Sequence, residues 1–344
     1  AWWHAAEELE ALAEERGEAW TFASAYHWAV RFRAEEPLEL VKLPHHMDRW
    51  GSLDADEREA TLAAVEELDA FLAHLQILTQ DPEILRRVNA RFQIADIHFD
   101  FEAFEDLGPL YVLVRRDVAL ETQGRRGPRT FFERLEGADP GAYQAALTGA
   151  HSVDFRRRQP DGSAWQMVLL GYEVETGLAQ NQLAWLTLHW YIGDAAGRSF
   201  DVVARVTDRD DRSYDFNHEL AAGAHPSDTL APGTILAESM AIPVPLDPTL
   251  FGGPDLRGDA VPVKLWLALA EYDRAPVDAT PDAPPGPKRL VGGLNPFQPS
   301  GALPIDRRGE GPGGISKAGY RWSADGLFQV GGFWLPVPDA ARTD

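Results

Sequence analysis

The chain has 344 residues, 44% of them hydrophobic, so it is long enough for two domains that each bury a core. Its formal net charge of -22 at pH 7 repels nucleic-acid backbones and anionic lipid head groups, which excludes both as expected partners. The sequence contains no cysteine, which rules out disulfides, thiolate zinc sites and a cysteine nucleophile. No apolar run is long enough for a membrane-spanning helix, and because the chain begins at Ala1 instead of Met we expect a processed terminus or a preceding segment.

Residues 1–173 predict an α/β domain. Apolar residues at helical spacing predict a first helix that ends near Gly17, with its glutamates mostly on the opposite side. A strand over 19–24, a helix over 25–36 and a strand over 38–44 then make a β-α-β unit.

Later in this domain the hydrophobic period changes. Leucine and valine at spacings of three and four predict one helix over residues 55–78, which continues after a break at Pro82. Beyond it the period becomes two, and strands are expected over 108–116, 151–158 and 164–174.

Residues 174–274 predict an all-β antiparallel sandwich, because helical patterns disappear and strand patterns alternate with turns rich in Asp and Gly. The strands are expected over 183–192, 199–208, 235–244 and 261–273. Residues 275–344 hold a large share of the 25 prolines and 30 glycines and predict an extended arm instead of long regular elements.

Three short stretches could hold a metal ion, and each has an adequate structural explanation. In "HHMDRW", His45, His46 and Asp48 are neighbours whose side chains diverge, and a structural loop is the preferred interpretation. In "TDRDDRSYD", the carboxylates fall where a hairpin turn is expected and lack the Gly and distal Glu of a calcium loop.

The third stretch is "DIHFDFE". Alternation places three polar residues on one face of a strand: Asp96, His98 and Asp100. This pattern fits a carboxylate-histidine-carboxylate row, but it also fits a strand with one wet face and one dry face, which we prefer. We therefore expect no bound metal and a chain that is stable without one.

Enzyme signatures are absent from the sequence. It contains no G-x-S-x-G elbow, Walker loop, dinucleotide fingerprint or H-E-x-x-H pair. We expect no cofactor and nominate no catalytic residue.

The order of the first elements resembles a known family. The helix "HAAEELEALAEE", a strand, the helix start "SAYHWAVRF", a strand ending in Pro44 and the loop "HHMDRW" are similar to the extracytoplasmic C-terminal region of bacterial dolichyl-phosphate-mannose mannosyltransferase-like membrane glycosyltransferases. In this resemblance Tyr26 takes the place of a tyrosine at the helix start. Asp48 and Trp50 take the places of a polar residue and of the aromatic residue that comes after it in the loop. The resemblance covers about residues 1–245 and implies a periplasmic or extracellular location. The membrane helices and acidic catalytic loop of that family have no counterpart here, so the resemblance assigns no catalytic residue.

Our favoured hypothesis is a noncatalytic extracytoplasmic subunit that docks on a membrane-embedded protein complex. Aromatic residues near the amino end and in the arm are typical interface anchors. The candidates are Trp2, Trp3, Phe297, Trp322, Phe328, Phe333 and Trp334. Equally, these rings could cover the protein's own sandwich.

Two alternatives remain open. The chain could be the soluble domain of a membrane glycosyltransferase that contacts a lipid-linked sugar or acceptor, since aromatic faces stack on sugar rings and polar groups fix their orientation. The residues for this role are Tyr26, Trp28, His45, His46 and Trp50. A carbohydrate-binding β-sandwich would instead use Trp185, Trp190 and Trp266, although alternation places the first two on opposite faces.

Overall fold

A computed structural model gives the fold of the chain. It describes residues 2–25, 37–98, 108–120, 128–147, 153–158, 164–178, 183–194, 199–207, 213–226, 229–243, 260–274, 288–290, 305–306 and 328–336. The chain divides into two compact units, Ala1–Phe131 and Phe132–Asp344.

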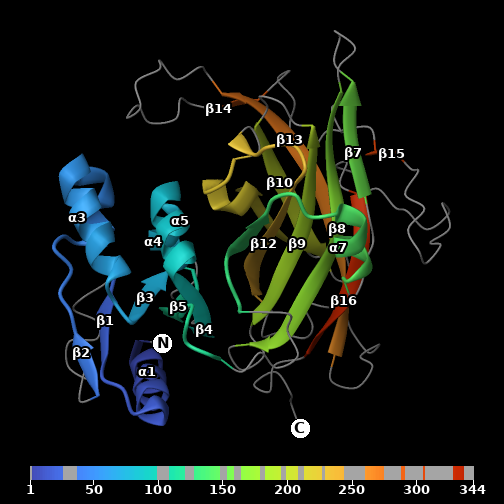
Figure 1. The fold of residues 1–344 in the computed structure, drawn as a ribbon. Coiled ribbons are helices and arrows are strands. Elements are labelled where there is room, and N and C mark those ends of the chain that lie inside the picture. Colours follow the sequence, from blue (N-terminus) through green and yellow to red (C-terminus); the bar gives the residue numbers. More distant parts are fainter. Residues whose placement is uncertain are drawn as a thin grey trace. The chain divides into compact units, whose positions relative to one another are not determined.

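The first unit is a mixed α/β fold, as the sequence predicts for its amino-terminal part (Figure 1). Its sheet has the order β2-β1-β3-β5-β4, in which β1 is parallel to β2 and β3 while β5 is antiparallel to β3 and β4. The elements are α1 (Trp2–Arg16), β1 (Trp20–Ser24), β2 (Leu38–Leu40), η1 (Met47–Ser52), α3 (Ala55–Glu66), β3 (Ala70–His74), α4 (Leu75–Thr79), α5 (Pro82–Arg91), β4 (Phe92–His98) and β5 (Leu110–Arg115).

Helix α1 covers one face of this sheet. Ala5, Leu9 and Ala13 recur at a spacing of four and are fully buried. They share a core with one face of the strands, formed by Trp20, Phe22, Leu38, Ala70, Leu72, Leu110, Val112 and Val114. Because strand side chains alternate, Phe71, Tyr111 and Leu113 point to the other face, where Figure 1 shows α3 and α5.

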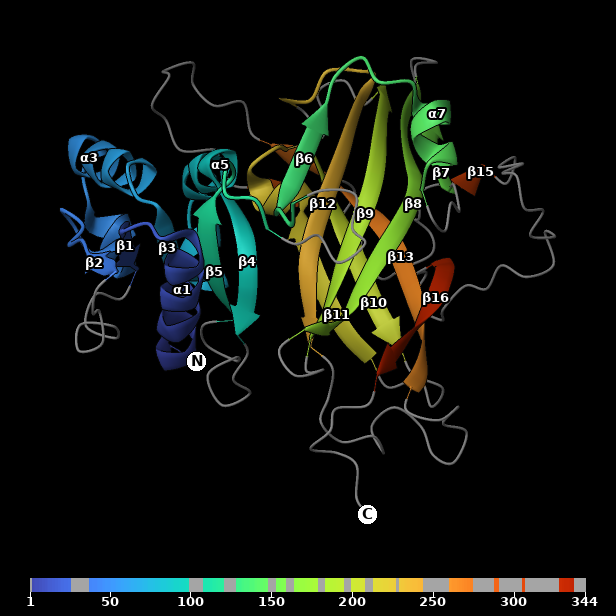
Figure 2. The ribbon, with the colours of Figure 1, turned by 60° about the horizontal axis from the view of Figure 1, so that its bottom comes forward.

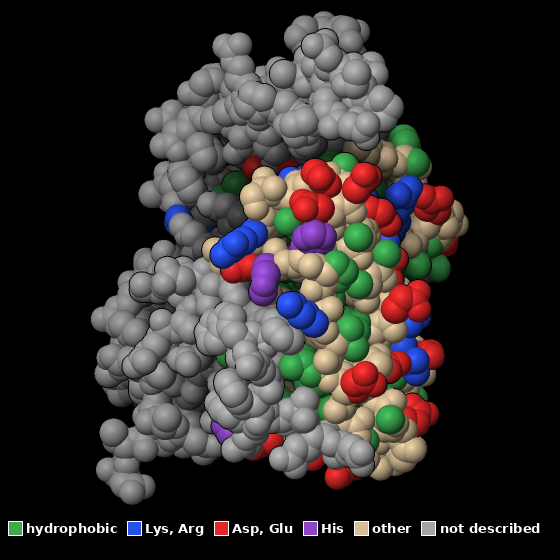
Figure 3. Space-filling view, turned by 90° about the vertical axis from the view of Figure 1, so that its left-hand side faces the viewer, with side chains coloured by type: hydrophobic (Ala, Val, Ile, Leu, Met, Phe, Trp, Pro, Cys, Tyr) green, Lys and Arg blue, Asp and Glu red, His purple; other side chains and the backbone are tan. Residues whose placement is uncertain are grey.

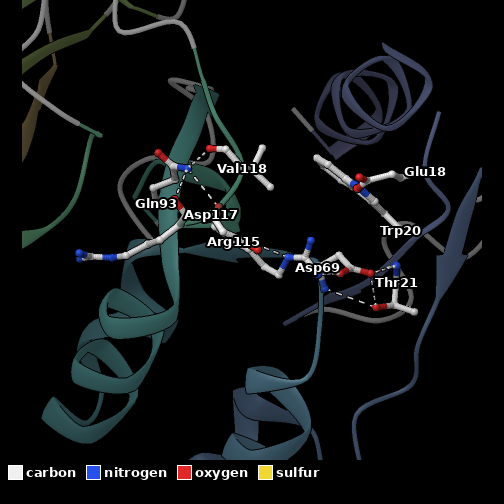
Figure 4. A network of polar contacts seen from close by, with 9 residues as sticks. Glu18, Trp20, Thr21, Asp69, Gln93, Arg115, Asp117 and Val118 are labelled. Atoms are coloured by element: carbon white, nitrogen blue, oxygen red, sulfur yellow. Dashed lines mark hydrogen bonds and ion pairs between the residues drawn. The ribbon is translucent and has the colours of Figure 1, made fainter. Parts of the chain in front are cut away.

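A polar network joins three strands at one end of the sheet (Figure 4). The Asp69 carboxylate accepts hydrogen bonds from the backbone N and the hydroxyl of Thr21 on β1, both at 2.8 Å. Arg115, at the end of β5, donates to the other Asp69 oxygen at 2.6 Å. The amide of Gln93 donates to the main-chain oxygens of Arg115 and Val118, at 3.0 and 2.5 Å. Side chains therefore form hydrogen bonds with main-chain groups that are not paired between strands.

The single helix expected over residues 55–78 is wrong. Helix α3 ends at Glu66, Ala70–His74 is the central strand β3, and a short α4 follows. All five residues of β3 are buried. A strand that is buried on both faces shows no alternation of polar and apolar residues. The apolar residues of β3 therefore fitted the helical spacing of the preceding segment, and the two elements were predicted as one helix.

The second unit is built almost entirely of antiparallel strands. Two sheets have the orders β15-β7-β8-β9-β12-β6 and β11-β10-β13-β14, and β16 pairs with β13. The elements are β6 (Phe132–Leu135), α7 (Pro140–Ala145), β7 (Val153–Arg158), β8 (Ala164–Leu178), β9 (Leu183–Asp194), β10 (Ser199–Thr207), β11 (Ser213–Glu219), η2 (Leu220–Gly223), β12 (Thr234–Pro243), β13 (Ala260–Arg274), β14 (Lys288–Leu290), β15 (Ile305–Asp306) and β16 (Phe328–Pro336). The β-strands expected between residues 183 and 273 are confirmed as β9, β10, β12 and β13.

The two sheets of this unit form two layers (Figure 2). β8, β9 and β12 lie in front of β10 and β13 in this view. Glu238 on β12 connects the layers, because its carboxylate accepts a hydrogen bond from the main-chain N of Ala221 in η2 and lies 3.2 Å from Nε2 of His218 on β11.

Two features of the second unit differ from the sequence-based expectation. The predicted boundary between residues 173 and 174 falls inside β8, which pairs with both β7 and β9, and the chain divides earlier, after Phe131. Phe328–Pro336 was expected in an extended arm, but it forms strand β16, antiparallel to residues 260–267 of β13. This part of the carboxyl-terminal segment belongs to the unit's own sheet.

None of the helices in the described residues combines the length and the apolar character needed to cross a membrane.

Candidate functional site

The loop "HHMDRW" is held rigidly on the first unit. Met47 and Trp50 are buried, and the indole Nε1 of Trp50 donates to the Asp81 carboxylate at 2.8 Å. The side-chain amide of Gln80 donates to the main-chain oxygen of Met47 at 2.7 Å, and the Arg58 guanidinium lies 5.8 Å from the centre of the Trp50 ring. Two buried side chains and two hydrogen bonds therefore fix the conformation of this loop.

The polar residues of the loop face outward. His46, Asp48 and Arg49 are exposed, and His45 is half-buried with its Nδ1 3.8 Å from the Glu57 carboxylate. Figure 3 shows a face of the molecule on which histidine, basic and acidic side chains lie beside one another, with hydrophobic side chains in small groups among them. Of the residues expected to bind a sugar, His45 and His46 are accessible, whereas Trp50 belongs to the interior. Tyr26 and Trp28 lie outside the described residues.

The aromatic residues expected to anchor a partner are placed in different ways. The ring of Trp2 packs against the core beneath α1 and stands edge-on to His74, with ring centres 5.1 Å apart. Trp3 is in α1, and Phe328, Phe333 and Trp334 are in β16. Phe297 and Trp322 lie outside the described residues. Trp2 is therefore part of the unit's own packing.

A cluster of three potential metal ligands lies between α1 and the edge strand β4. Nε2 of His98 is 3.0 Å from Oε2 of Glu8 and 3.6 Å from Oδ2 of Asp96. Among the described residues, these three form a group whose ligand atoms all lie within 4.8 Å of one another. All three side chains are partly buried.

The register of β4 explains why Asp96 and His98 face α1. They pair with Val112 and Leu110, whose side chains belong to the core beneath α1. Ile97, between them, is fully buried on the opposite side. A register shift between Ile94 and Asp96 precedes this pair, and such a bulge re-aims the residues that follow it. The alternation expected for "DIHFDFE" is thus present over its described residues.

The two carboxyl groups of the cluster titrate together. Burial, a hydrogen bond with Glu8 and its negative charge raise the pKa of Asp96 to about 6. Burial alone would raise the pKa of Glu8, but hydrogen bonds with His98 and Asp96 outweigh it and hold that pKa below its usual value. Near pH 6 the pair therefore shares a proton, with Asp96 as its usual carrier.

The second unit contains two further polar clusters. The fully buried Glu238 accepts a hydrogen bond from the Trp190 indole at 2.7 Å in addition to its contacts with Ala221 and His218. His189 is also buried; its Nδ1 is 2.9 Å from the Tyr143 hydroxyl, and its Nε2 is 3.3 Å from the Glu173 carboxylate. The first cluster connects the two layers, and the second attaches α7 to the sheet.

The tryptophans of the carbohydrate-binding alternative are all buried. Trp185, Trp190 and Trp266 are 4%, 0% and 7% exposed, so none offers an open ring face for a sugar. The indole of Trp266 donates to the Thr207 hydroxyl on the neighbouring strand at 2.7 Å. These residues belong to the core of the second unit.

Sequence reasoning identified Asp96 and His98 but missed Glu8, which it placed on the polar side of the first helix. Glu8 lies beside Leu9 at the border of the buried stripe, where it reaches the edge of the sheet. In the sequence, Glu8 is visible only as an acidic residue next to the apolar stripe of the helix. It can be assigned to a metal site only when the strand that packs beside the helix is known.

Comparison with known proteins gives little further information. No family model and no curated protein matches the chain. A solved structure described as the C-terminal domain of Wzt is 14% identical, covers 40% of this chain and 73% of that chain, and superposes with a TM-score of 0.22. At this TM-score the likeness supports no statement about the fold or the function of the chain.

Proposed function

We propose that this chain is a noncatalytic extracytoplasmic recognition subunit that docks on a membrane-embedded protein complex through the "HHMDRW" loop. The supporting observation is the construction of this loop, in which Met47 and Trp50 are buried while His46, Asp48 and Arg49 are exposed. A surface that is rigid before binding loses little conformational entropy when a partner binds.

The charge of the loop and of the chain defines the expected partner. The loop presents imidazole, carboxylate and guanidinium groups side by side, which suits a polar protein surface with charges of both signs. The net charge of -22 disfavours docking on anionic lipid, so the contact is assigned to a protein.

This proposal replaces the docking surface expected from the sequence. Trp2 packs within its own unit, and Phe328–Pro336 pairs with β13, so these parts of the chain already have intramolecular roles. The loop carries the proposal in their place.

Site-specific photo-crosslinking in native membranes tests the proposal. A photoreactive residue in place of His46 or Arg49 is expected to crosslink to an integral membrane protein. A photoreactive residue in place of Glu15, exposed on α1, is the matched control and should give no such product. Equal crosslinking from all three positions, or recovery of the chain as an isolated monomer after mild detergent extraction, would contradict the proposal.

A second candidate is the extracytoplasmic part of a membrane glycosyltransferase of the type that the sequence resembles, which would contact a lipid-linked sugar. The observation that favours it is the accessibility of His45 and His46 in a fixed loop, because imidazole groups can hydrogen-bond to sugar hydroxyls. Stacking by Trp50 is not part of this candidate, since that ring is buried.

Nuclear magnetic resonance separates the two candidates. Polyprenyl-phosphate mannose in detergent micelles should shift the imidazole signals of His45 and His46, while empty micelles should not. His4, exposed on α1, serves as the internal control. Unchanged His45 and His46 signals would remove the sugar-binding candidate and leave the docking proposal unaffected.

A further inference from the structure

We propose that Glu8, Asp96 and His98 form a binding site for a divalent transition-metal ion of the Zn²⁺ class. The sequence alone led us to expect no metal, because Asp96 and His98 supply only two ligands with an ordinary structural explanation. Glu8 adds a third ligand from a different element, 90 positions away in the sequence.

The distances between the donor atoms fit such an ion. Zinc binds imidazole nitrogen and carboxylate oxygen at about 2.1 Å, so two ligands of a tetrahedral site lie roughly 3.4 Å apart. The observed distances from Nε2 of His98 are 3.0 Å to Glu8 and 3.6 Å to Asp96. Small movements of the side chains would therefore bring all three atoms into a single coordination sphere.

The electrostatics of the cluster also favour a cation. Two carboxylates lie close together in a partly buried position, where their negative charges repel each other. A bound dication would neutralise both charges.

The donor set indicates which ions would bind. Calcium and magnesium prefer oxygen ligands only, whereas imidazole with carboxylates suits zinc and neighbouring transition metals. Three protein ligands leave one position of a tetrahedral site to water, and the partial exposure of the cluster allows water to reach it.

The position of the cluster indicates that a bound ion would stabilise the fold. Glu8 belongs to α1, whereas Asp96 and His98 belong to the edge strand β4. A shared ion would connect this helix to the edge of the sheet, so binding to the folded state is expected to raise its stability.

Calorimetric titration of Zn²⁺ into the untagged, chelator-stripped chain at neutral pH tests the site. One ion should bind, and Glu8→Gln or His98→Ala should each weaken binding by about tenfold or more, equivalent to at least about 1.4 kcal/mol. Glu14→Gln, on the exposed side of the same helix, is the matched control and should bind as the unmodified chain does.

Cobalt spectroscopy supplies a second measurement, which begins with the unmodified chain. Co²⁺ bound to the unmodified chain should give the visible absorption of a four-coordinate ion with a nitrogen ligand, and the nearly isosteric Asp96→Asn should weaken it. The proposal is wrong if the unmodified chain binds neither ion, or if Glu8→Gln, Asp96→Asn and His98→Ala all bind as tightly as it does. Because neither measurement involves the loop or its partner, failure here is independent of the proposed docking function.

Discussion

Asp69 accepts hydrogen bonds from Thr21 and forms an ion pair with Arg115, although no sequence motif marks any of the three. Its carboxylate is 17% exposed, and the Arg115 side chain is 28% exposed, so solvent replaces little of the lost interaction if one partner is removed. The position therefore has a larger expected effect on stability than an ordinary surface ion pair.

We predict that Asp69→Ala lowers the free energy of unfolding of the first unit by about 2–4 kcal/mol, because Thr21 loses a hydrogen-bond acceptor and Arg115 loses the less exposed of its two carboxylate partners. Asp117→Ala is the control, since Asp117 also contacts Arg115, at 3.1 Å, but is 72% exposed. That variant should change the free energy of unfolding by less than about 1 kcal/mol. Urea unfolding measures both, and equal losses would contradict the importance given to the Asp69 contacts.

Asp96 should make stability depend on pH when no metal is bound. Its pKa is raised from 3.8 to about 6 by burial and by Glu8, and the charged groups that act on it are Glu8 on α1 and His98 on β4. A raised pKa in the folded state means that the stabilising contribution of the protonated acid is complete below about pH 4. That contribution is lost as the pH rises through about 6.

Asp96→Asn should therefore remove part of the fall in stability between about pH 4 and pH 6. At neutral pH the variant should be more stable by roughly 1 kcal/mol, a value reduced for the screening of a side chain about one-third exposed. Thermal unfolding with chelator across this pH range measures the effect, and Glu14→Gln is the control. A parallel pH profile for Asp96→Asn would show that Asp96 does not titrate as described.

At the scale of the elements, η2 contains the only alanines with positive φ among the described residues. Ala221 and Ala222 have φ of 50° and 51°, a region in which a β-carbon is unfavourable. The contact between the main-chain N of Ala221 and the buried Glu238 holds the turn in this conformation. The turn that follows β11 is thus stabilised by a side chain from β12.

Ala222→Gly should raise the melting temperature of the second unit, because glycine adopts positive φ without steric cost. The expected gain is about 0.5–1 kcal/mol. Ala63→Gly, at an exposed position of α3, should have the opposite sign and cost about 1 kcal/mol. Differential scanning calorimetry measures both changes, and a loss of stability in Ala222→Gly would mean that the turn is not strained.

The elements differ in how far their sequences determine them. Helix α3 begins with a capping box in which the side chains of Asp54 and Glu57 each accept a hydrogen bond from the other residue's main-chain N. Such a start is readable from a few neighbouring residues. Strand β3 has no polar alternation, because it lies centrally in the sheet, between β1 and β5, and both of its faces are buried.

At the scale of the whole molecule, the strands with clear alternation were predictable, but their partners in the sheets were not. Alternating residues identified β9, β10, β12 and β13, but the pairing of β6 with β12 and of β16 with β13 joins segments that are distant in the sequence. The proposed metal site likewise depends on contacts between segments that are distant in the sequence. Asp96 and His98 were visible as an alternating pair, whereas Glu8 joins them only through the packing of α1 on the sheet.

The division after Phe131 predicts how fragments behave. A fragment of residues 1–131 should fold cooperatively, because its sheet and the core beneath α1 are complete within it. A fragment of residues 1–173 should aggregate, because it adds β7 and part of β8 without β9 and leaves an unpaired strand edge. Size-exclusion chromatography and circular dichroism compare the two, and a monomeric, cooperatively folded longer fragment would favour the later boundary.

The pairing of β16 with β13 has a consequence for biosynthesis. A ribosome releases β13 first, and the strand that covers residues 260–267 follows only after about 60 more residues, a delay of several seconds at ordinary rates of translation. During that interval, the nascent chain presents an open hydrogen-bonding edge of β13 to its surroundings. A premature stop codon before Phe328 would make this temporary exposure permanent, so such truncated products should become substrates for chaperones and proteases even though every residue of the first unit is intact.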